Sequence, residues 1–202
     1  MAADDHQALI LDQFTRQATP FATAPGIQDA EALALIVDFS GAGPDDTVLD
    51  VACGPGIVVC AFARTVRHAT GIDVTPAMLD RARALQRESG LTNVTWRQGD
   101  VLPLPYPDAA FSIVVCRFAF HHFLQPGRVL AEMRRACAPG GTVMVVDAAP
   151  AADKADAFNR MEKLRDPQFD RAVDVLKGIM IFAQRAPADE KPVGKDGKIA
   201  AK

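Results

Sequence analysis

From residue 47 onward, the chain alternates short apolar segments with helix-like segments, and this alternation limits the fold more than any other feature. Strands separated by helices pair in parallel, and the helices cover both faces of the sheet. Right-handed crossovers then produce a doubly wound, Rossmann-like α/β fold. Helices are expected over Ile57–Val66, from Thr75 to Gly90, and over Pro126–Cys137. The segments expected to form strands are Thr47–Val51, Ala69–Asp73, Val94–Gln98, Phe111–Phe118 and Thr142–Asp147.

The texture of the sequence divides the chain into four parts. Residues 1–41 carry apolar residues at helical spacing and are expected to form N-terminal helices, whereas residues 42–150 hold the alternating strands and helices. Residues 151–186 are expected to form C-terminal helices, with Asp166–Ala186 as one amphipathic helix. Residues 187–202 combine lysine, glycine and proline with mixed charge, which predicts a disordered tail. The apolar stripe expected on the amphipathic helix is Phe169, Val173, Leu176, Met180 and Ala183.

Composition and charge argue against several classes of protein. A net charge of −3 over 202 residues gives no general attraction for nucleic acid or for an anionic membrane. No stretch approaches the roughly 18 apolar residues of a membrane span, and acids stand near the N-terminus where a signal peptide would carry lysines. The cysteines, Cys53, Cys60, Cys116 and Cys137, are scattered and form no C-x-x-C pair. Reduced thiols in a cytoplasmic protein are therefore expected.

The stretch VLDVACGPG, residues 48–56, ends an apolar strand in a carboxylate and then turns with very little side chain. In an open parallel sheet, ligands bind beyond the carboxyl ends of the strands. Asp50 lies at such an end, while Gly54 and Gly56 let the backbone turn sharply and let a ligand approach without a Cβ in the way. The following helix presents its free N–H groups to the same place. The stretch therefore predicts a site for a nucleotide-like molecule, although Gly-x-Gly turns alone are common.

Two further strand ends add to this expected site. Asp73 ends the segment ATGID, nineteen positions after Gly54, where an acid in Rossmann-like folds accepts hydrogen bonds from ribose hydroxyls. The third strand is followed by Asp100 and Val101, a polar residue beside an apolar one that could meet the edge and the face of an adenine. Asp100 also fits a simple turn-forming role after Gly99. Three such positions at adjacent strand ends predict a ligand that contains adenosine.

The type of adenosine ligand follows from the residues of the loop. Val59 breaks the dinucleotide fingerprint G-x-G-x-x-G, and the chain has no G-x-x-x-x-G-K-[ST] loop. Asp50 would repel a phosphate and would favour a cation, such as an α-ammonium or a sulfonium. An adenosine that bears methionine carries both of these cations.

Four segments of the chain together resemble a known family. In chain order they are VLDVACGPG, ATGIDVTPAMLDRAR, GDVLPLPYPDAAFSIVVCRFAFHHF and EMRRACAPGGTVMVVD. In this order they resemble the class I S-adenosylmethionine-dependent methyltransferases, closest to the small-molecule branch that includes the ubiquinone/menaquinone C-methyltransferases. The resemblance covers roughly Phe14–Asp147. It implies S-adenosylmethionine as the cofactor, methyl transfer to a small-molecule acceptor, and a lid over the cofactor formed by N-terminal helices that include Phe14 and Phe21.

The resemblance also implies a role for each matching residue. Its first motif contacts the methionyl part of the cofactor, and the acid after the second strand binds the ribose. Apolar residues after that acid and the third-strand motif lie at the adenine, and the fourth-strand motif lies beside the methyl group. The residues that match the first motif are Asp50, Ala52, Gly54 and Gly56, and Asp73 matches the acid at the ribose. The positions at the adenine are matched by Val74 and Met78 and by the third-strand residues Asp100 and Val101. The fourth-strand motif is matched by Arg117 and Phe118. His121 and His122 begin the segment that usually borders the substrate.

Methyl transfer from a sulfonium is an in-line displacement, in which most of the catalysis is alignment and exclusion of water. A base matters only if the nucleophile must lose a proton. His121 is the candidate for that base, because it follows the fourth strand where methyl group and acceptor should meet. His121 and His122 can equally be structural histidines, one packed and one solvated. A histidine pair can also bind metal, but no acid or cysteine stands at ligand spacing, so no metal is predicted.

The C-terminal part departs from the resemblance. Members of the family normally continue past the fifth strand with a helix and an antiparallel pair of strands, and the sequence shows no such pair. The fifth strand is then expected to be an unprotected edge at which two chains could associate. Two alternatives to an active methyltransferase stay open. One is a catalytically impaired remnant that binds the cofactor, or binds a protein through its last helix. The other is an NAD-dependent oxidoreductase, which Val59 and Asp50 disfavour.

Overall fold

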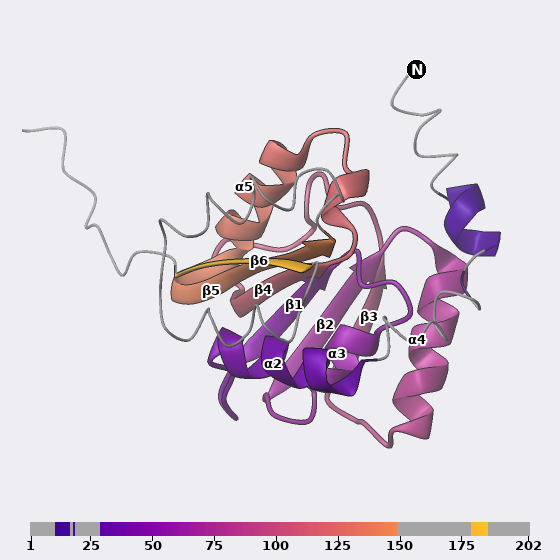
Figure 1. Cartoon of the computed structure of the whole chain (residues 1–202), viewed down its shortest axis with the longest axis horizontal. Helices are drawn as coiled ribbons and strands as arrows, with labels where there is room; N and C mark the ends of the chain where they lie inside the picture. Colours follow the sequence, from indigo (N-terminus) through magenta and orange to yellow (C-terminus); the bar gives the residue numbers. More distant parts are fainter. Residues whose placement is uncertain (1–10, 17, 19–28, 149–178, 186–202) are drawn as a thin grey trace, which may run out of the picture.

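The computed structural model describes residues 11–16, 18, 29–148 and 179–185, and it shows one sheet with helices on both faces (Figure 1). The strand order is β3-β2-β1-β4-β5-β6. The strands are β1 (Thr47–Val51), β2 (His68–Asp73), β3 (Val94–Gln98), β4 (Phe111–Arg117), β5 (Cys137–Ala148) and β6 (Ile179–Arg185). The helices are α2 (Ala30–Ser40), α3 (Ile57–Phe62), α4 (Pro76–Glu88), the short 3-10 helix η1 (Phe120–His122) and α5 (Pro126–Ala136).

The first five strands pair in parallel, and β1 lies between β2 and β4. The chain therefore runs outward from β1 to β3 and then returns to β4 on the other side of β1. This reversal is the point at which open α/β sheets bind ligands, beyond the carboxyl ends of the strands. The predicted doubly wound, Rossmann-like fold is confirmed.

Two apolar clusters hold the helices against the sheet. In Figure 1, α2 and α3 lie on one face and α5 lies on the other. Val48 of β1 belongs to the cluster with Ile36 of α2, Phe62 of α3 and Leu79 of α4, whereas Leu49 packs with α5 on the opposite face. Neighbouring side chains alternate between two covered faces, which explains why β1 and β4 are almost entirely buried.

The edge of β5 is covered, which corrects the expectation of an exposed fifth strand. β6 pairs antiparallel with β5, from Thr142 opposite Arg185 to Ala148 opposite Ile179. The prediction that Asp166–Ala186 is one helix is wrong for Ile179–Arg185, which is a strand. The described residues contain this one antiparallel strand and not a pair. The reason for expecting self-association through β5 is therefore removed.

The element ends differ from the predicted ones by a few residues. The helix expected to reach Val66 ends at Phe62, and Phe118, expected inside the fourth strand, lies just beyond it with a left-handed φ of 56°. Asp29 caps α2 by accepting hydrogen bonds from the N–H groups of Glu31 and Ala32. Residues 11–16 are helical, as predicted. The predictions for Phe21, for residues 151–178 and for residues 187–202 lie outside the described part of the chain.

The indole of Trp96 on β3 fixes the spacing between β2 and the helices beside it. It packs directly over Gly71 of β2 and over Gly56, the N-cap of α3. Its Nε1 donates a hydrogen bond of 2.7 Å to Oε1 of Gln86 in α4. A Cβ on Gly71 would come within 2.7 Å of both the Trp96 ring and Sγ of Cys53. The ATGID segment therefore needs its glycine for packing, although its φ is not left-handed.

Gly71→Ala should destabilise the protein by about 1–3 kcal/mol, the usual cost of forcing an extra methyl group into a packed interior. The measurement is urea unfolding, followed by circular dichroism. Gly127→Ala in α5 is the matched control, because a Cβ there would meet nothing within 4 Å and its φ is not left-handed. Equal unfolding midpoints for the Gly71 variant and the wild type would contradict this account of the Trp96 contact.

Candidate functional site

A cavity with a volume of about 370 Å³ opens at the carboxyl ends of the central strands. Residues after β1, β2, β3 and β4 line it, together with η1, the start of α5 and Phe14. The structure thus gathers segments that are far apart in the sequence. Two predicted site residues, Gly56 and His121, are not among the lining residues. The predicted residues that do line the cavity are Asp50, Ala52, Gly54, Asp73, Val74, Met78, Asp100, Val101, Arg117 and Phe118.

The loop after β1 needs three left-handed residues, Ala52, Gly54 and Gly56, with φ angles of 57°, 52° and 79°. The two glycines serve different purposes. A Cβ on Gly54 would meet nothing within 4 Å, so this residue presents bare backbone to the cavity. A Cβ on Gly56 would overlap the Trp96 ring and approach the Ala82 methyl group to 2.7 Å. Gly54 therefore leaves room for a ligand, whereas Gly56 permits helix packing.

The carboxylate of Asp73 holds this loop in place. Its Oδ2 accepts a hydrogen bond of 2.8 Å from the Gly54 N–H, and its Oδ1 accepts one of 2.8 Å from the Thr75 N–H. Burial raises the pKa of Asp73, and these hydrogen bonds oppose the rise. Asp73 thus ties β2 to the glycine loop, and it lines the cavity, where a ribose hydroxyl could reach it.

Asp50 is the most deeply buried charge of the cavity. Its side chain is 1% exposed, and its Oδ1 has no hydrogen-bond partner among the described residues. Burial raises its pKa well above the usual value, the positive charge of Arg117 opposes this, and the nearby Asp73 adds to it. Burial likewise lowers the pKa of Arg117, whose guanidinium lies 4.4 Å from the centre of the Phe118 ring. A buried carboxylate facing a cavity is poised to accept a cationic ligand.

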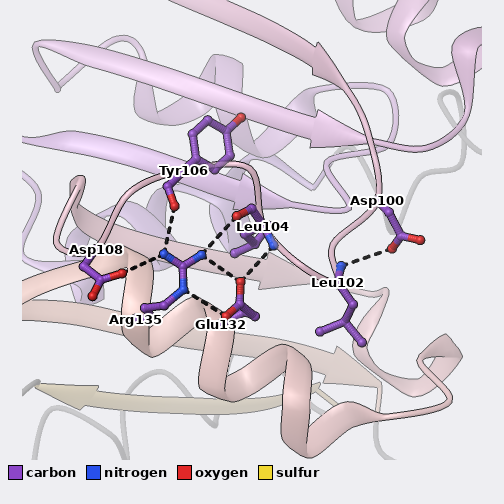
Figure 2. A network of polar contacts seen from close by, with 7 residues as sticks. All are labelled: Asp100, Leu102, Leu104, Tyr106, Asp108, Glu132 and Arg135. Carbon is purple, nitrogen blue, oxygen red and sulfur yellow. Dashed lines mark hydrogen bonds and ion pairs between the residues drawn. The ribbon is translucent and has the colours of Figure 1, made fainter.

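The wall after β3 is a turn held by Asp100. Its Oδ1 accepts a hydrogen bond of 2.6 Å from the N–H of Val101. It accepts a second one, of 3.2 Å, from the N–H of Leu102, which Figure 2 shows. Asp100, Val101 and Leu102 all line the cavity. The turn-forming role considered for Asp100 is therefore present, and it does not remove the residue from the cavity wall.

Arg135 of α5 fixes the rest of this loop to the body of the protein, as Figure 2 shows. Its guanidinium donates to the carbonyl oxygens of Leu104 and Tyr106 at 3.0 and 2.8 Å. It also donates to the carboxylate of Asp108 at 2.9 Å and twice to that of Glu132, at 2.9 and 2.7 Å. Glu132 in turn accepts the Leu104 N–H at 2.9 Å. This set of residues is called the Arg135 clamp below.

The two neighbouring histidines have different surroundings. The Nδ1 of His121 lies 2.7 Å from Oδ1 of Asp147 at the end of β5, and its backbone N–H donates to Oδ2 of Asp147 at 2.9 Å. His122 lines the cavity, where its ring lies 5.1 Å from that of Phe14 and 3.9 Å from that of His121. The candidate base His121 is thus held beside the cavity, whereas His122 faces it. No cluster of three metal-binding side chains occurs in the part of the chain that the structure describes.

Several lining residues were not among the predicted site residues. The clearest group runs from the end of η1 into the first turn of α5, and its members are Phe123, Leu124, Gln125, Arg128 and Val129. The sequence places α5 correctly, but the position of its first turn at the cavity depends on the short 3-10 helix before it. Pro126 at the first helical position indicated that a helix begins here, but no local signal indicated that this first turn reaches the cavity.

Comparison with known proteins gives consistent matches. A family model described as "Methyltransferase domain" matches residues 48–141. The uncharacterized methyltransferase YcgJ of Bacillus subtilis is 32% identical over 172 residues, which cover 84% of this chain and 68% of that protein. The ubiquinone/menaquinone biosynthesis C-methyltransferase UbiE of Bdellovibrio bacteriovorus is 38% identical over 114 residues, covering 55% of this chain and 48% of UbiE.

Solved structures agree with the sequence matches. The crystal structure of YcgJ superimposes with a TM-score of 0.57 at 28% identity, covering 72% of this chain and 67% of that one. The complex of DhpI with SAH gives a TM-score of 0.58 at 26% identity, covering 70% of this chain and 69% of that one. The chain spans about two thirds of YcgJ and about half the length of the UbiE protein it matches.

Proposed function

The chain belongs to the S-adenosylmethionine-dependent methyltransferase family, and from this premise we propose that it transfers a methyl group from S-adenosylmethionine to a small-molecule acceptor. The cavity at the strand ends is the proposed site of both molecules. The observation that carries this proposal is Asp50, a buried carboxylate that lines the same cavity as the bare backbone of Gly54 and whose Oδ1 lacks a hydrogen-bond partner among the described residues.

The residues present fit this cofactor. Asp50 and Arg117 both line the cavity and attract each other electrostatically, so opposite charges stand where the α-ammonium and α-carboxylate of an amino acid would bind. Gly54 leaves room for a bulky neighbour, and Asp73 lines the cavity as a hydrogen-bond acceptor for ribose hydroxyls. Val74, Met78 and Val101 supply apolar contacts for a flat ring. A pyrophosphate would meet Asp50 and Asp73 instead, which speaks against a dinucleotide.

The proposed roles follow from the chemistry of methyl transfer. S-adenosylmethionine supplies a methyl group that is electrophilic because it is bonded to a sulfonium. The protein contributes alignment and a cavity whose walls include the aromatic rings of Phe14 and Phe118. Where the acceptor must lose a proton, His122 faces the cavity directly, and His121 is the second candidate base, oriented by Asp147.

Titration calorimetry tests the binding part of the proposal. We expect S-adenosylmethionine and S-adenosylhomocysteine to bind and NAD to give no heat. A radiolabelled-methyl assay over a panel of quinols and small phenols then tests transfer. Binding without transfer to any acceptor would favour the cofactor-binding remnant, and binding of NAD alone would favour an oxidoreductase.

Asp73→Asn should weaken S-adenosylhomocysteine binding about tenfold, which corresponds to about 1.4 kcal/mol. An asparagine can still accept one of the two backbone hydrogen bonds, but its amide group would face the other N–H donor. Calorimetry gives the affinity. Asp80→Asn, an exposed acid on α4, is the control with the same change in charge. Unchanged affinity of the Asp73 variant would place the ribose elsewhere.

We propose two further features. The N-terminal residues 1–41 contribute to a lid, because Phe14 reaches the cavity and its ring contacts His122. The protein acts in the cytoplasm, since its four cysteines are free and buried in the structure. No helix in the described residues has the length and apolar character needed to cross a membrane. The net charge of −3 gives no reason to propose a nucleic-acid acceptor.

A further inference from the structure

The charges of the cavity are unevenly distributed. The carboxylates of the wall, those of Asp50, Asp73 and Asp100, follow β1, β2 and β3. Another part of the wall is lined by residues 122–125, 128 and 129 and is called the acceptor wall below. Among the described lining residues of the acceptor wall, Arg128 is a cation and none is an acid. A cationic cofactor fits the carboxylate side by charge, which leaves the acceptor wall for the second substrate.

The acceptor wall is apolar and partly open to water. Phe123 and Leu124 lie beside His122, whose ring contacts Phe14. Leu124 is 56% exposed, and among the described residues it is the one large apolar side chain that is exposed. A single exposed leucine is ordinary, but this one lines a cavity beside aromatic rings. An apolar molecule bound there would remove this side chain from water, which favours binding.

Arg128 is held at this wall in a defined position. Its Nη1 donates a hydrogen bond of 2.8 Å to Oε1 of Gln125, which also lines the cavity. The contact uses one of the five N–H groups of the guanidinium. The planar group can therefore still offer paired N–H donors to an anionic oxygen pair.

We propose that the acceptor wall selects an apolar molecule that bears one anionic group, with the anion on Arg128 and the apolar body on Phe123 and Leu124. This inference rests on the proposed function, because it assigns the carboxylate side of the cavity to the cofactor. An acceptor with a cationic group near Arg128 would be repelled. The acceptor class therefore follows from the uneven charge of one cavity.

A pair of fluorescent probes with the same ring system tests this proposal. Anilinonaphthalene sulfonate carries an anion, and N-phenylnaphthylamine lacks it. Both are titrated into the full chain in the presence of saturating S-adenosylhomocysteine, whose own binding is measured by calorimetry. Arg128→Gln should weaken the sulfonate about tenfold, the loss expected for one charge-assisted hydrogen bond, and should leave the neutral probe within about twofold. Arg128→Lys, which keeps the charge but not the paired N–H donors, should restore only part of the sulfonate affinity.

Two further variants separate the anion from the apolar body. Arg134→Gln removes an exposed arginine from the same helix that does not line the cavity, and it should change neither probe. Leu124→Ser should weaken both probes by a similar factor. The proposal is overturned if Arg128→Gln leaves the sulfonate affinity unchanged or weakens both probes equally. Failure of S-adenosylhomocysteine to bind would instead count against the proposed function.

Discussion

Asp50→Asn should weaken S-adenosylmethionine binding roughly hundredfold, about 3 kcal/mol, while the protein stays folded. The carboxylate is buried, lines the cavity and has an Oδ1 without a partner among the described residues. Asparagine keeps the shape but removes the negative charge that would balance the cofactor's cations. Calorimetry with S-adenosylmethionine gives the affinity, and circular dichroism reports the fold. Asp45→Asn, an exposed acid just before β1, has the same effect on net charge and should bind normally.

The affinity for S-adenosylmethionine should fall in acid, and this direction of the pH dependence tests whether Asp50 binds the cofactor. Because burial raises the pKa of Asp50, its carboxylate is protonated in the free protein at a higher pH than an ordinary aspartate. A bound cation favours the ionised form, so binding should release a proton, and affinity should fall as the pH drops through that raised pKa. In Asp50→Asn this dependence should be absent. A variant that binds as tightly as the wild type, with the same pH profile, would exclude Asp50 from the site.

The same raised pKa predicts how the variant affects stability. A raised native pKa means that the folded state binds the proton more strongly than the unfolded chain does. The stability that this proton contributes is present below the unfolded value of about 3.9 and is lost as the pH rises through the native value. Around neutral pH, the wild type therefore bears the cost of a buried carboxylate. The unfolding midpoint of the ligand-free Asp50→Asn variant should stay the same or rise, so its binding defect cannot be attributed to misfolding.

The sequence predicted the sheet from β1 to β5 because its signals are local. Most of these strands are short, largely apolar segments, and glycine, proline or helix-capping residues separate them from the helices. The strand β6 was missed because two local patterns compete in its sequence. Met180 and Ala183 complete an apolar stripe at helical spacing, yet the run from Ile179 to Phe182 is continuously apolar, which suits a strand. The choice depends on pairing with β5, more than thirty residues away, and no local pattern records that pairing.

The candidate site, like the sheet, was predicted only in part from the sequence. Residues that follow parallel strands meet at one edge of the sheet, so Asp50, Asp73 and Val101 could be brought together from the sequence alone. Adjacent histidines could not be distinguished, because in a 3-10 helix successive side chains point about 120° apart. The roles of Asp73 and Arg135 toward backbone atoms were also hidden, since a backbone N–H or carbonyl group leaves no mark in the sequence.

The Arg135 clamp shows what such a hidden role contributes. A guanidinium has five N–H donors, and in this structure Arg135 uses all five, on Glu132, Asp108 and the carbonyl oxygens of Leu104 and Tyr106 (Figure 2). The Arg135 hydrogen bond to Glu132 is the first cause that lowers the pKa of that glutamate. The clamp connects α5 to the loop that begins at the cavity wall, so it couples stability to the shape of the site.

Arg135→Lys should destabilise the protein by about 2–4 kcal/mol, because an ammonium cannot reach four partners in a plane and roughly three hydrogen bonds, each worth about 1 kcal/mol, would be lost. Urea unfolding measures this, with Arg134→Lys on the same helix as the control. The stability that ionised Glu132 contributes is present above the unfolded pKa of about 4.3 and is lost as the pH falls through the lowered native value. The difference between Arg135→Lys and wild type should therefore shrink in acid. A difference that is below 1 kcal/mol at neutral pH, or that grows in acid, would show that the clamp adds little to the fold.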